Sequence, residues 1–123
     1  MTKTKQALLT TTLLLTSALS FANGNNSTSI YDFYNNTTGE VTTFGNGDKT
    51  ELTNTYINNT TLWLIGLLTN KVVKNTIGGA SKTNTVNYLY NTDGTLKTET
   101  FEPSNSAFTV LNSYQYDTYG NIF

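Results

Sequence analysis

The stretch VNYLYNTDGTLKTETF, residues 86–101, decides the fold class. Val86, Tyr88 and Tyr90 alternate with Asn87 and Leu89, and a period of two residues is typical of a β-strand. The cluster Asn-Thr-Asp-Gly at 91–94 follows. Asn, Asp and Gly tolerate the positive φ angle that closes a tight hairpin. The alternation resumes over residues 97–100, so the stretch predicts two antiparallel strands joined by a turn.

The same pattern recurs along the chain. A turn at 45–48 is expected to join strands near 41–44 and 49–57, and a turn at 78–81 to join 71–77 to 82–90. A further alternating run covers 110–116. Outside the first 22 residues, no window of helical length carries an apolar stripe with a period of 3.6 residues. We therefore predict an all-β fold built from antiparallel β-hairpins.

Composition excludes several functional classes. The 123 residues limit the chain to one small domain, and 26 Thr and 17 Asn dominate it. Without Cys there is no disulfide framework or thiolate metal site, and without His there is no Ser-His-Asp relay. All seven cationic residues are Lys and the net charge is −1, which is not the footprint of a nucleic-acid-binding protein.

Residues 1–22 read as a secretory signal peptide. Lys3 and Lys5 form a positive n-region, and an apolar stretch of 13 residues follows at 7–19. Ala22 ends a suitable cleavage site. A membrane anchor needs about 20 apolar residues. We therefore expect a helix that is cleaved, no membrane span afterwards, and a bacterial protein that is secreted or held in the envelope. Residues 23–29 are expected to be a disordered leader, and residues 30–123 the β domain.

The apolar run Leu62-Trp63-Leu64-Ile65-Gly66-Leu67-Leu68 differs from the rest of the chain. We expect a buried strand or corner, with Trp63 as the core anchor and Gly66 allowing close backbone approach. The alternative is an exposed patch for a partner or a membrane.

A short motif occurs three times. The fullest copy is Tyr114-Gln115-Tyr116-Asp117-Thr118-Tyr119-Gly120-Asn121. The others start at Tyr88 and Tyr31. In each, tyrosines are expected to pack on one sheet face, while Asp or Asn bonds the turn and Gly takes the positive φ. The candidate motif residues are Tyr31, Asp32, Tyr88, Tyr90, Asn91, Asp93, Gly94, Tyr114, Tyr116, Asp117, Gly120 and Asn121.

This motif resembles the YD repeat of the Rhs family, whose unit is Tyr-x-Tyr-Asp-x-x-Gly-Asn. Residues 41–68 and 97–103 resemble the segments that flank such units in SpvB/TcC-type insecticidal toxin proteins, with units near 31–57, 70–101 and 108–123. The resemblance implies β-hairpins that coil into a hollow shell around a toxic domain. Because the chain is far shorter than a shell, we expect an open segment of a spiral sheet, from a truncated or split protein.

Three functions follow from these observations. The first is a non-catalytic module that contacts further YD-repeat segments or a second copy of itself. The second is a carbohydrate-binding module, because tyrosine rings can stack on sugars. The third is an enzyme with a carboxylate pair such as Glu99 or Glu102 with Asp117, but no spacing selects a pair. We expect no catalytic residue, no cofactor and no metal, since no loop has the alternating acidic ligands of a calcium site.

Overall fold

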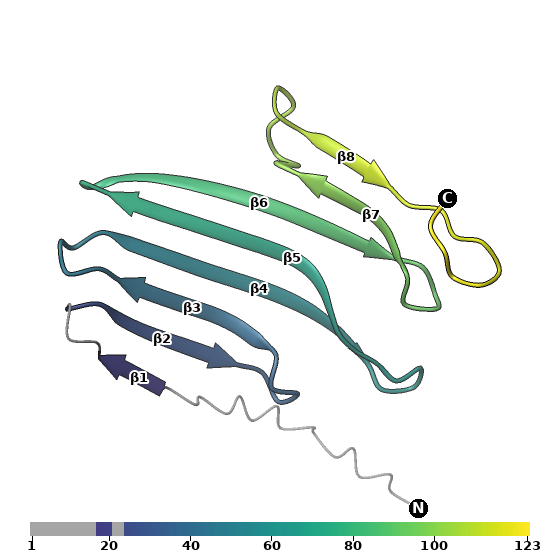
Figure 1. Cartoon of the computed structure of the whole chain (residues 1–123), viewed down its shortest axis with the longest axis horizontal. Helices are drawn as coiled ribbons and strands as arrows, with labels where there is room; N and C mark the ends of the chain where they lie inside the picture. Colours follow the sequence, from purple (N-terminus) through teal and green to yellow (C-terminus); the bar gives the residue numbers. More distant parts are fainter. Residues whose placement is uncertain (1–16, 21–23) are drawn as a thin grey trace, which may run out of the picture.

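The computed structural model describes residues 17–20 and 24–123, which form one open antiparallel sheet (Figure 1). Each strand pairs with the strand before it, so the order across the sheet follows the order of the chain. The all-β prediction of antiparallel hairpins is therefore confirmed. The eight strands are β1 (Ser17–Ser20), β2 (Asn26–Tyr31), β3 (Thr37–Thr43), β4 (Lys49–Asn59), β5 (Leu64–Ile77), β6 (Ala80–Tyr90), β7 (Leu96–Phe101) and β8 (Val110–Ser113).

The two faces of the sheet differ in composition. In β4, Leu52, Asn54 and Tyr56 are half-buried, whereas Thr53 and Thr55 point the other way and are exposed. The strand register carries this division across the sheet. One face, the tyrosine face, holds Leu52, Tyr56, Val73, Val86, Tyr88, Tyr90, Phe101, Val110, Tyr114 and Tyr116. The other, the threonine face, holds Thr28, Thr43, Thr53, Thr55, Thr76, Thr83, Thr85, Thr98 and Thr100.

No described residue is fully buried. A single sheet has no second layer packed on either face, so its apolar side chains are covered only by their neighbours. The prediction that Trp63 anchors a core is wrong, because its side chain is 83% exposed in the turn between β4 and β5. The side chain of Asn59 accepts hydrogen bonds from the backbone N–H of Thr61 and Leu62 and so closes that turn before the apolar run enters β5.

The N-terminal region also differs from expectation. Asn26–Ser29 belong to β2 rather than to a disordered leader. The reason is that β3 supplies a full antiparallel partner for this polar segment, and sheet pairing outweighs low strand propensity. Ser17–Ser20 form β1, which pairs with Asn26–Ser29. The rest of the predicted signal peptide, with its helix, and Asn23 lie outside the described residues.

Candidate functional site

The predicted motif turns at Asp32 and Asp117 are closed in the same way. The backbone N–H of Asp117 donates to the carbonyl of Asn121 at 2.9 Å, and the carbonyl of Asp117 accepts the N–H of Gly120 at 3.1 Å. The carboxylate accepts from the N–H of Tyr119 and of Asn121, each at 2.9 Å, and from the Asn121 side chain at 3.0 Å. The aspartate therefore uses its acceptors to hold its own turn.

The turn at Asp32 repeats every one of these bonds, with Asn36 in the place of Asn121. Asn35 stands where Gly120 stands, and both have positive φ, 65° and 84°. Asn is one of the few residues that tolerate this conformation, which explains why the departure from Gly leaves the turn intact.

The third motif turn uses a different side-chain pattern. The backbone bonds are the same, from Asn91 N–H to Thr95 and from Gly94 N–H to Asn91. Asp93, rather than the residue at the start of the turn, accepts the Thr95 N–H at 2.9 Å and the Thr95 hydroxyl at 2.7 Å. Phe44–Asp48 closes with the same two backbone bonds but without a Tyr-Asp motif. The backbone geometry is thus more general than the motif.

The electrostatics of these aspartates follow from their bonds. Burial acts to raise the pKa of Asp32, but hydrogen bonds from Asn36, Asn58 and Tyr34 hold it below its ordinary value of 3.8. Hydrogen bonds from Thr95 lower the pKa of Asp93, and bonds from Asn121 lower that of Asp117. All three carboxylates are therefore ionised at neutral pH and hydrogen-bonded within their own turns, which makes them turn-holding groups rather than proton donors.

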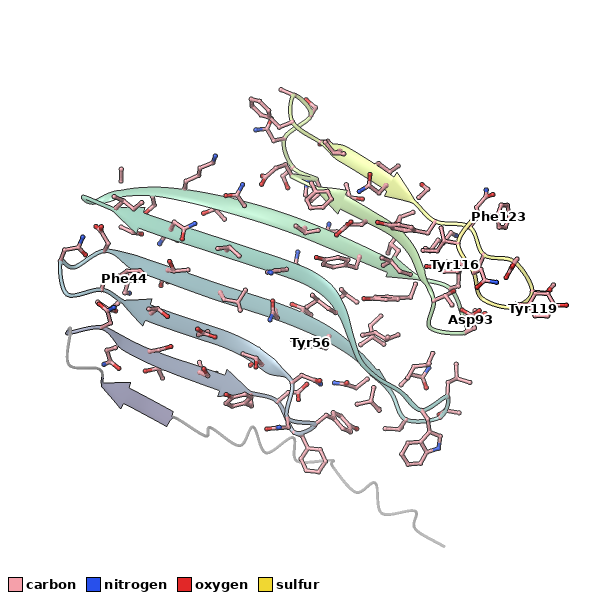
Figure 2. The ribbon with its side chains drawn as sticks, viewed as in Figure 1. Phe44, Tyr56, Asp93, Tyr116, Tyr119 and Phe123 are labelled. Atoms are coloured by element: carbon pink, nitrogen blue, oxygen red, sulfur yellow. The ribbon has the colours of Figure 1, made fainter. Side chains whose placement is uncertain are left out.

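A row of tyrosine hydroxyl groups links neighbouring strands, and we call it the tyrosine ladder. It comprises Tyr31, Tyr56, Tyr90 and Tyr116, and the hydroxyls of the last three make the bonds between strands. The hydroxyl of Tyr56 donates to the carbonyl of Thr37 at 2.9 Å, and that of Tyr90 to Leu68 at 2.8 Å. The hydroxyl of Tyr116 donates to Leu96 at 2.9 Å (Figure 2 labels Tyr56 and Tyr116).

The ladder follows the register of the sheet. Thr37, Leu68 and Leu96, whose carbonyls accept these bonds, pair respectively with Tyr31, Tyr56 and Tyr90. A register shift lies just before each of those three tyrosines. From Tyr56 onward, each tyrosine thus bonds the backbone residue that faces the previous tyrosine of the row. The structural repeat has four members, and sequence analysis missed Tyr56, whose next residue is Ile57 instead of Asp. The sequence signal that could have identified Tyr56 is Asn58, which follows it by two residues.

Tyr88 and Tyr114 lie beside Glu99 on the tyrosine face. The Tyr114 hydroxyl donates to Glu99 at 3.2 Å. Burial raises the pKa of Tyr88, and the negative charge of Glu99 adds to the shift. Burial and the hydrogen bond with Glu99 likewise raise the pKa of Tyr114. A phenol with a raised pKa stays protonated at neutral pH, so neither tyrosine supplies a phenolate as a base or nucleophile.

A polar cluster joins the first two turns at one end of the sheet. Asn58 accepts the N–H of Gly66 at 2.8 Å and donates to the Asp32 carboxylate at 3.2 Å. Gly66 has φ 76°, and a Cβ built there would lie 2.7 Å from Asn36 Oδ1. The close backbone approach expected at Gly66 is therefore present, although it serves a turn contact instead of a core.

The most exposed aromatic side chains stand in the turns at this same end. Tyr119 is 90% exposed, Trp63 83% and Phe33 81%. Figure 1 shows the connections that carry them along one end of the sheet, where β2, β4 and β8 finish. Trp63 also has φ 53°, a conformation that is strained for a bulky side chain. The packing of the strands requires none of these three rings.

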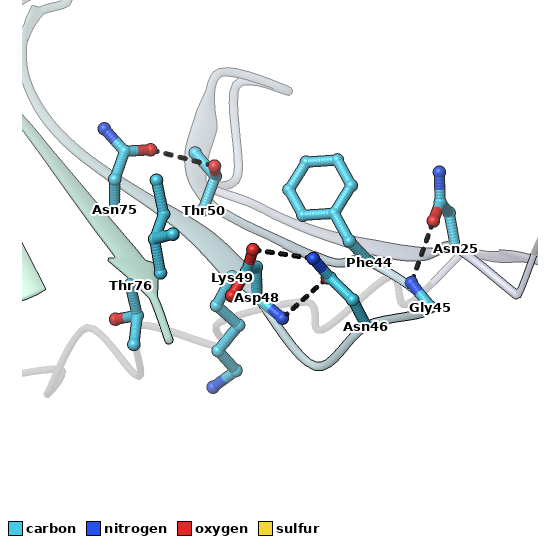
Figure 3. A pocket seen from close by; sticks show the side chains of 10 residues that line it. Asn25, Phe44, Gly45, Asn46, Asp48, Lys49, Thr50, Asn75 and Thr76 are labelled. Carbon is cyan, nitrogen blue, oxygen red and sulfur yellow. Dashed lines mark hydrogen bonds between the residues drawn. The ribbon is translucent and has the colours of Figure 1, made fainter. Parts of the chain in front are cut away.

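A shallow depression of about 680 Å3 lies at the opposite end, beside Phe44 and the start of β4 (Figure 3). Its polar groups already have partners. Asp48 accepts from the Asn46 side chain at 2.8 Å and from the N–H of Gly78 at 2.9 Å, and Thr50 donates to Asn75 at 2.9 Å. The depression therefore offers few free groups to a ligand.

The carboxylates considered for catalysis have separate structural partners. Glu102 accepts from the Asn84 side chain and from the N–H of Thr85, whereas Asp117 holds the last turn. Among residues 17–20 and 24–123, no three acidic side chains gather as a metal site. The same residues contain no helix of the length and apolarity needed to cross a membrane.

Comparison with protein-family models, curated proteins and solved structures gives no match for this chain. The resemblance to YD repeats therefore rests on the motif residues alone and stays a prediction.

Proposed function

We propose that this chain is a non-catalytic structural module of YD-repeat type, exported from a bacterium, whose task is to join a larger β-sheet assembly. One observation carries the proposal: the described chain is an open sheet in which no side chain is fully buried. A sheet with a half-covered apolar face gains free energy when another layer or strand covers it. Such an assembly is the expected role of a segment of an Rhs-type shell.

The polar side chains support the same role. Asp32, Asn91, Asp93 and Asp117 bond their own turns. The hydroxyls of Tyr56, Tyr90 and Tyr116 bond backbone carbonyls. Groups that are hydrogen-bonded within their own turns and strands build a scaffold, and this supports a non-catalytic role.

Sedimentation velocity of the purified chain, combined with binding of a dye for exposed apolar surface, tests the proposal. We expect concentration-dependent assembly, with dye binding that falls as assembly proceeds. A folded monomer at every concentration, with no dye binding, would refute it. Export is tested separately by the intact mass of the product in cells and medium, where cleavage after Ala22 is expected.

Carbohydrate binding is the second candidate, and the exposed ring of Trp63 is the observation that favours it. The hydroxyls of Tyr56, Tyr90 and Tyr116 are bonded to the backbone. The rings of Trp63 and Tyr119, in contrast, are exposed and can stack on sugar rings. Retention of the chain on immobilised polysaccharides should fall in Trp63→Ala. The matched control is Phe108→Ala, which removes a 70% exposed ring from the loop between β7 and β8. Equal retention of the two variants would exclude this site.

A further inference from the structure

The last strand of the sheet has an unprotected edge. All four residues of β8 are exposed, and Val110 and Leu111 are 53% and 61% exposed. Residues 103–116 contain no charged side chain. Proteins usually protect an edge strand with charges, Pro or a bulge, because its free N–H and C=O groups attract another strand. β8 itself has none of these features.

The hydrogen bonds show which backbone groups face outward. Tyr114 donates its N–H to the carbonyl of Lys97, and Ser113 pairs with Thr98. In an antiparallel pair the bonded and non-bonded positions alternate. Asn112 is therefore bonded to β7, whereas the N–H and C=O of Leu111 and Ser113 point away from it. Their direction leaves these groups ready to bond a new strand.

The chain itself covers only one end of this edge. Ile122 forms a bridge with Tyr116, and Phe123 donates its N–H to the carbonyl of Gln115 at 3.2 Å. Among the described residues, the stretch from Val110 to Tyr114 has no partner on its outer side. Five residues are enough for a short strand pair.

We propose that β8 pairs with β8 of a second copy of this chain, antiparallel, about a two-fold axis at Asn112. This deepens the proposed function, on which it rests. In this register Asn112 lies opposite Asn112 of the second copy. Val110 then lies opposite Tyr114 of the second copy, and Leu111 lies opposite its Ser113. A β-branched residue opposite an aromatic ring is a favourable cross-strand pair. Leu111 and Ser113 then exchange hydrogen bonds through the groups that point outward.

Because β8 carries no charged side chain, the β8 edges of two copies can pair without repulsion. A copy approaching edge to edge brings no like charges opposite one another within residues 110–114. The two-fold axis also keeps both tyrosine faces on the same side, so the apolar surface becomes continuous from Phe101 and Val110 of one copy to those of the other. The sheets of the two copies become one sheet.

A single cysteine tests the register, because the chain has none of its own. Asn112 would occupy a non-bonded position opposite its copy, where Cα atoms lie about 4.5 Å apart, within the range of a disulfide. Under mild oxidation Asn112→Cys should form disulfide dimers roughly tenfold faster, or more, than Lys82→Cys, an exposed site on the inner strand β6. Equal rates would overturn the interface.

Leu111→Pro provides an independent measurement. It removes an N–H that points outward and leaves the bonds to β7 in place. We expect the wild-type dimer to be lost in sedimentation while the circular dichroism spectrum of the folded sheet is kept. If wild-type chains assemble but Leu111→Pro assembles equally well and Asn112→Cys does not cross-link, this interface is wrong and the proposed function stands. If no chain assembles, both fail.

Discussion

The hydroxyl of Tyr90 is a good measure of what the tyrosine ladder contributes. It donates to the carbonyl of Leu68 at 2.8 Å from a half-buried ring. Tyr90→Phe should lower the free energy of unfolding by about 1 kcal/mol, because the ring stays and one hydrogen bond is lost. Urea unfolding measures it. Tyr119→Phe, in a ring that is 90% exposed, is the control and should have no effect. Equal effects would mean that the ladder bond contributes nothing.

We expect Trp63 to destabilise the fold at its position in the turn. Its φ of 53° disfavours a side chain with a Cβ, and its ring is 83% exposed. Trp63→Gly should therefore raise the free energy of unfolding by roughly 1 kcal/mol in thermal or urea melts. Trp63→Ala keeps the strain and serves as the control, with no gain expected. A less stable Trp63→Gly would show that the ring packs on the sheet.

At the residue scale, sequence was a good guide to turn chemistry and a poor guide to burial. Asp117 and Gly120 take the roles that their chemistry predicts, because side-chain bonds within five residues depend only on local sequence. The exposure of Trp63 could not be predicted in this way. It depends on the absence of a second layer, which no short stretch encodes.

Among the elements, the connection from β4 to β5 depends most on a glycine. Gly66→Ala should cost more stability than Gly47→Ala. Both have positive φ, 76° and 88°, but a Cβ at Gly66 lies 2.7 Å from Asn36, whereas none lies within 4 Å at Gly47. We expect a loss of roughly 1–2 kcal/mol for Gly47→Ala and a larger one for Gly66→Ala. Denaturant melts of the pair measure the difference. Equal losses would mean that Asn36 moves aside freely.

The aspartate turns should make the sheet sensitive to acid. The folded-state pKa values of Asp32, Asp93 and Asp117 lie below the ordinary 3.8. A lowered pKa stabilises the fold above the unfolded value, and that contribution is lost as pH falls through the folded value. The thermal midpoint should therefore hold from pH 7 to about pH 5 and fall below about pH 4. Asp117→Asn should be less stable at pH 7 but fall less steeply in acid. An identical slope would contradict the role of this turn.

At the element scale, alternation predicted the hairpins from residue 41 onward, but not all of their bounds: β5 begins at Leu64 instead of residue 71, and β8 ends at Ser113 instead of residue 116. It failed at Asn26–Ser29, where polar residues read as a leader and form β2. Tyr56 was missed for a related reason. Its place in the ladder is set by the register with β3 and β5, and pairing across strands is not visible in a linear pattern.

For the whole molecule, the sequence predicted the open sheet through a family resemblance, whereas the one-layer architecture came from the structure. If the sheet assembles as we propose, its stability should depend on protein concentration. An open sheet that assembles is stabilised by mass action, because only the folded chain binds its partner. A hundredfold rise in protein concentration should raise the thermal midpoint by roughly 5 °C or more for a domain of this size.

Calorimetry over that range measures the shift, and Leu111→Pro is the matched control, with a midpoint that should barely change if β8 is the contact. A midpoint independent of concentration in the wild type would mean that the sheet is stable alone. The hydrogen bonds of its turns and ladder would then be sufficient without a covered face. A shift that survives in Leu111→Pro would move the contact from the β8 edge to the tyrosine face, where Leu52, Val73 and Val86 offer the apolar surface that a second layer needs.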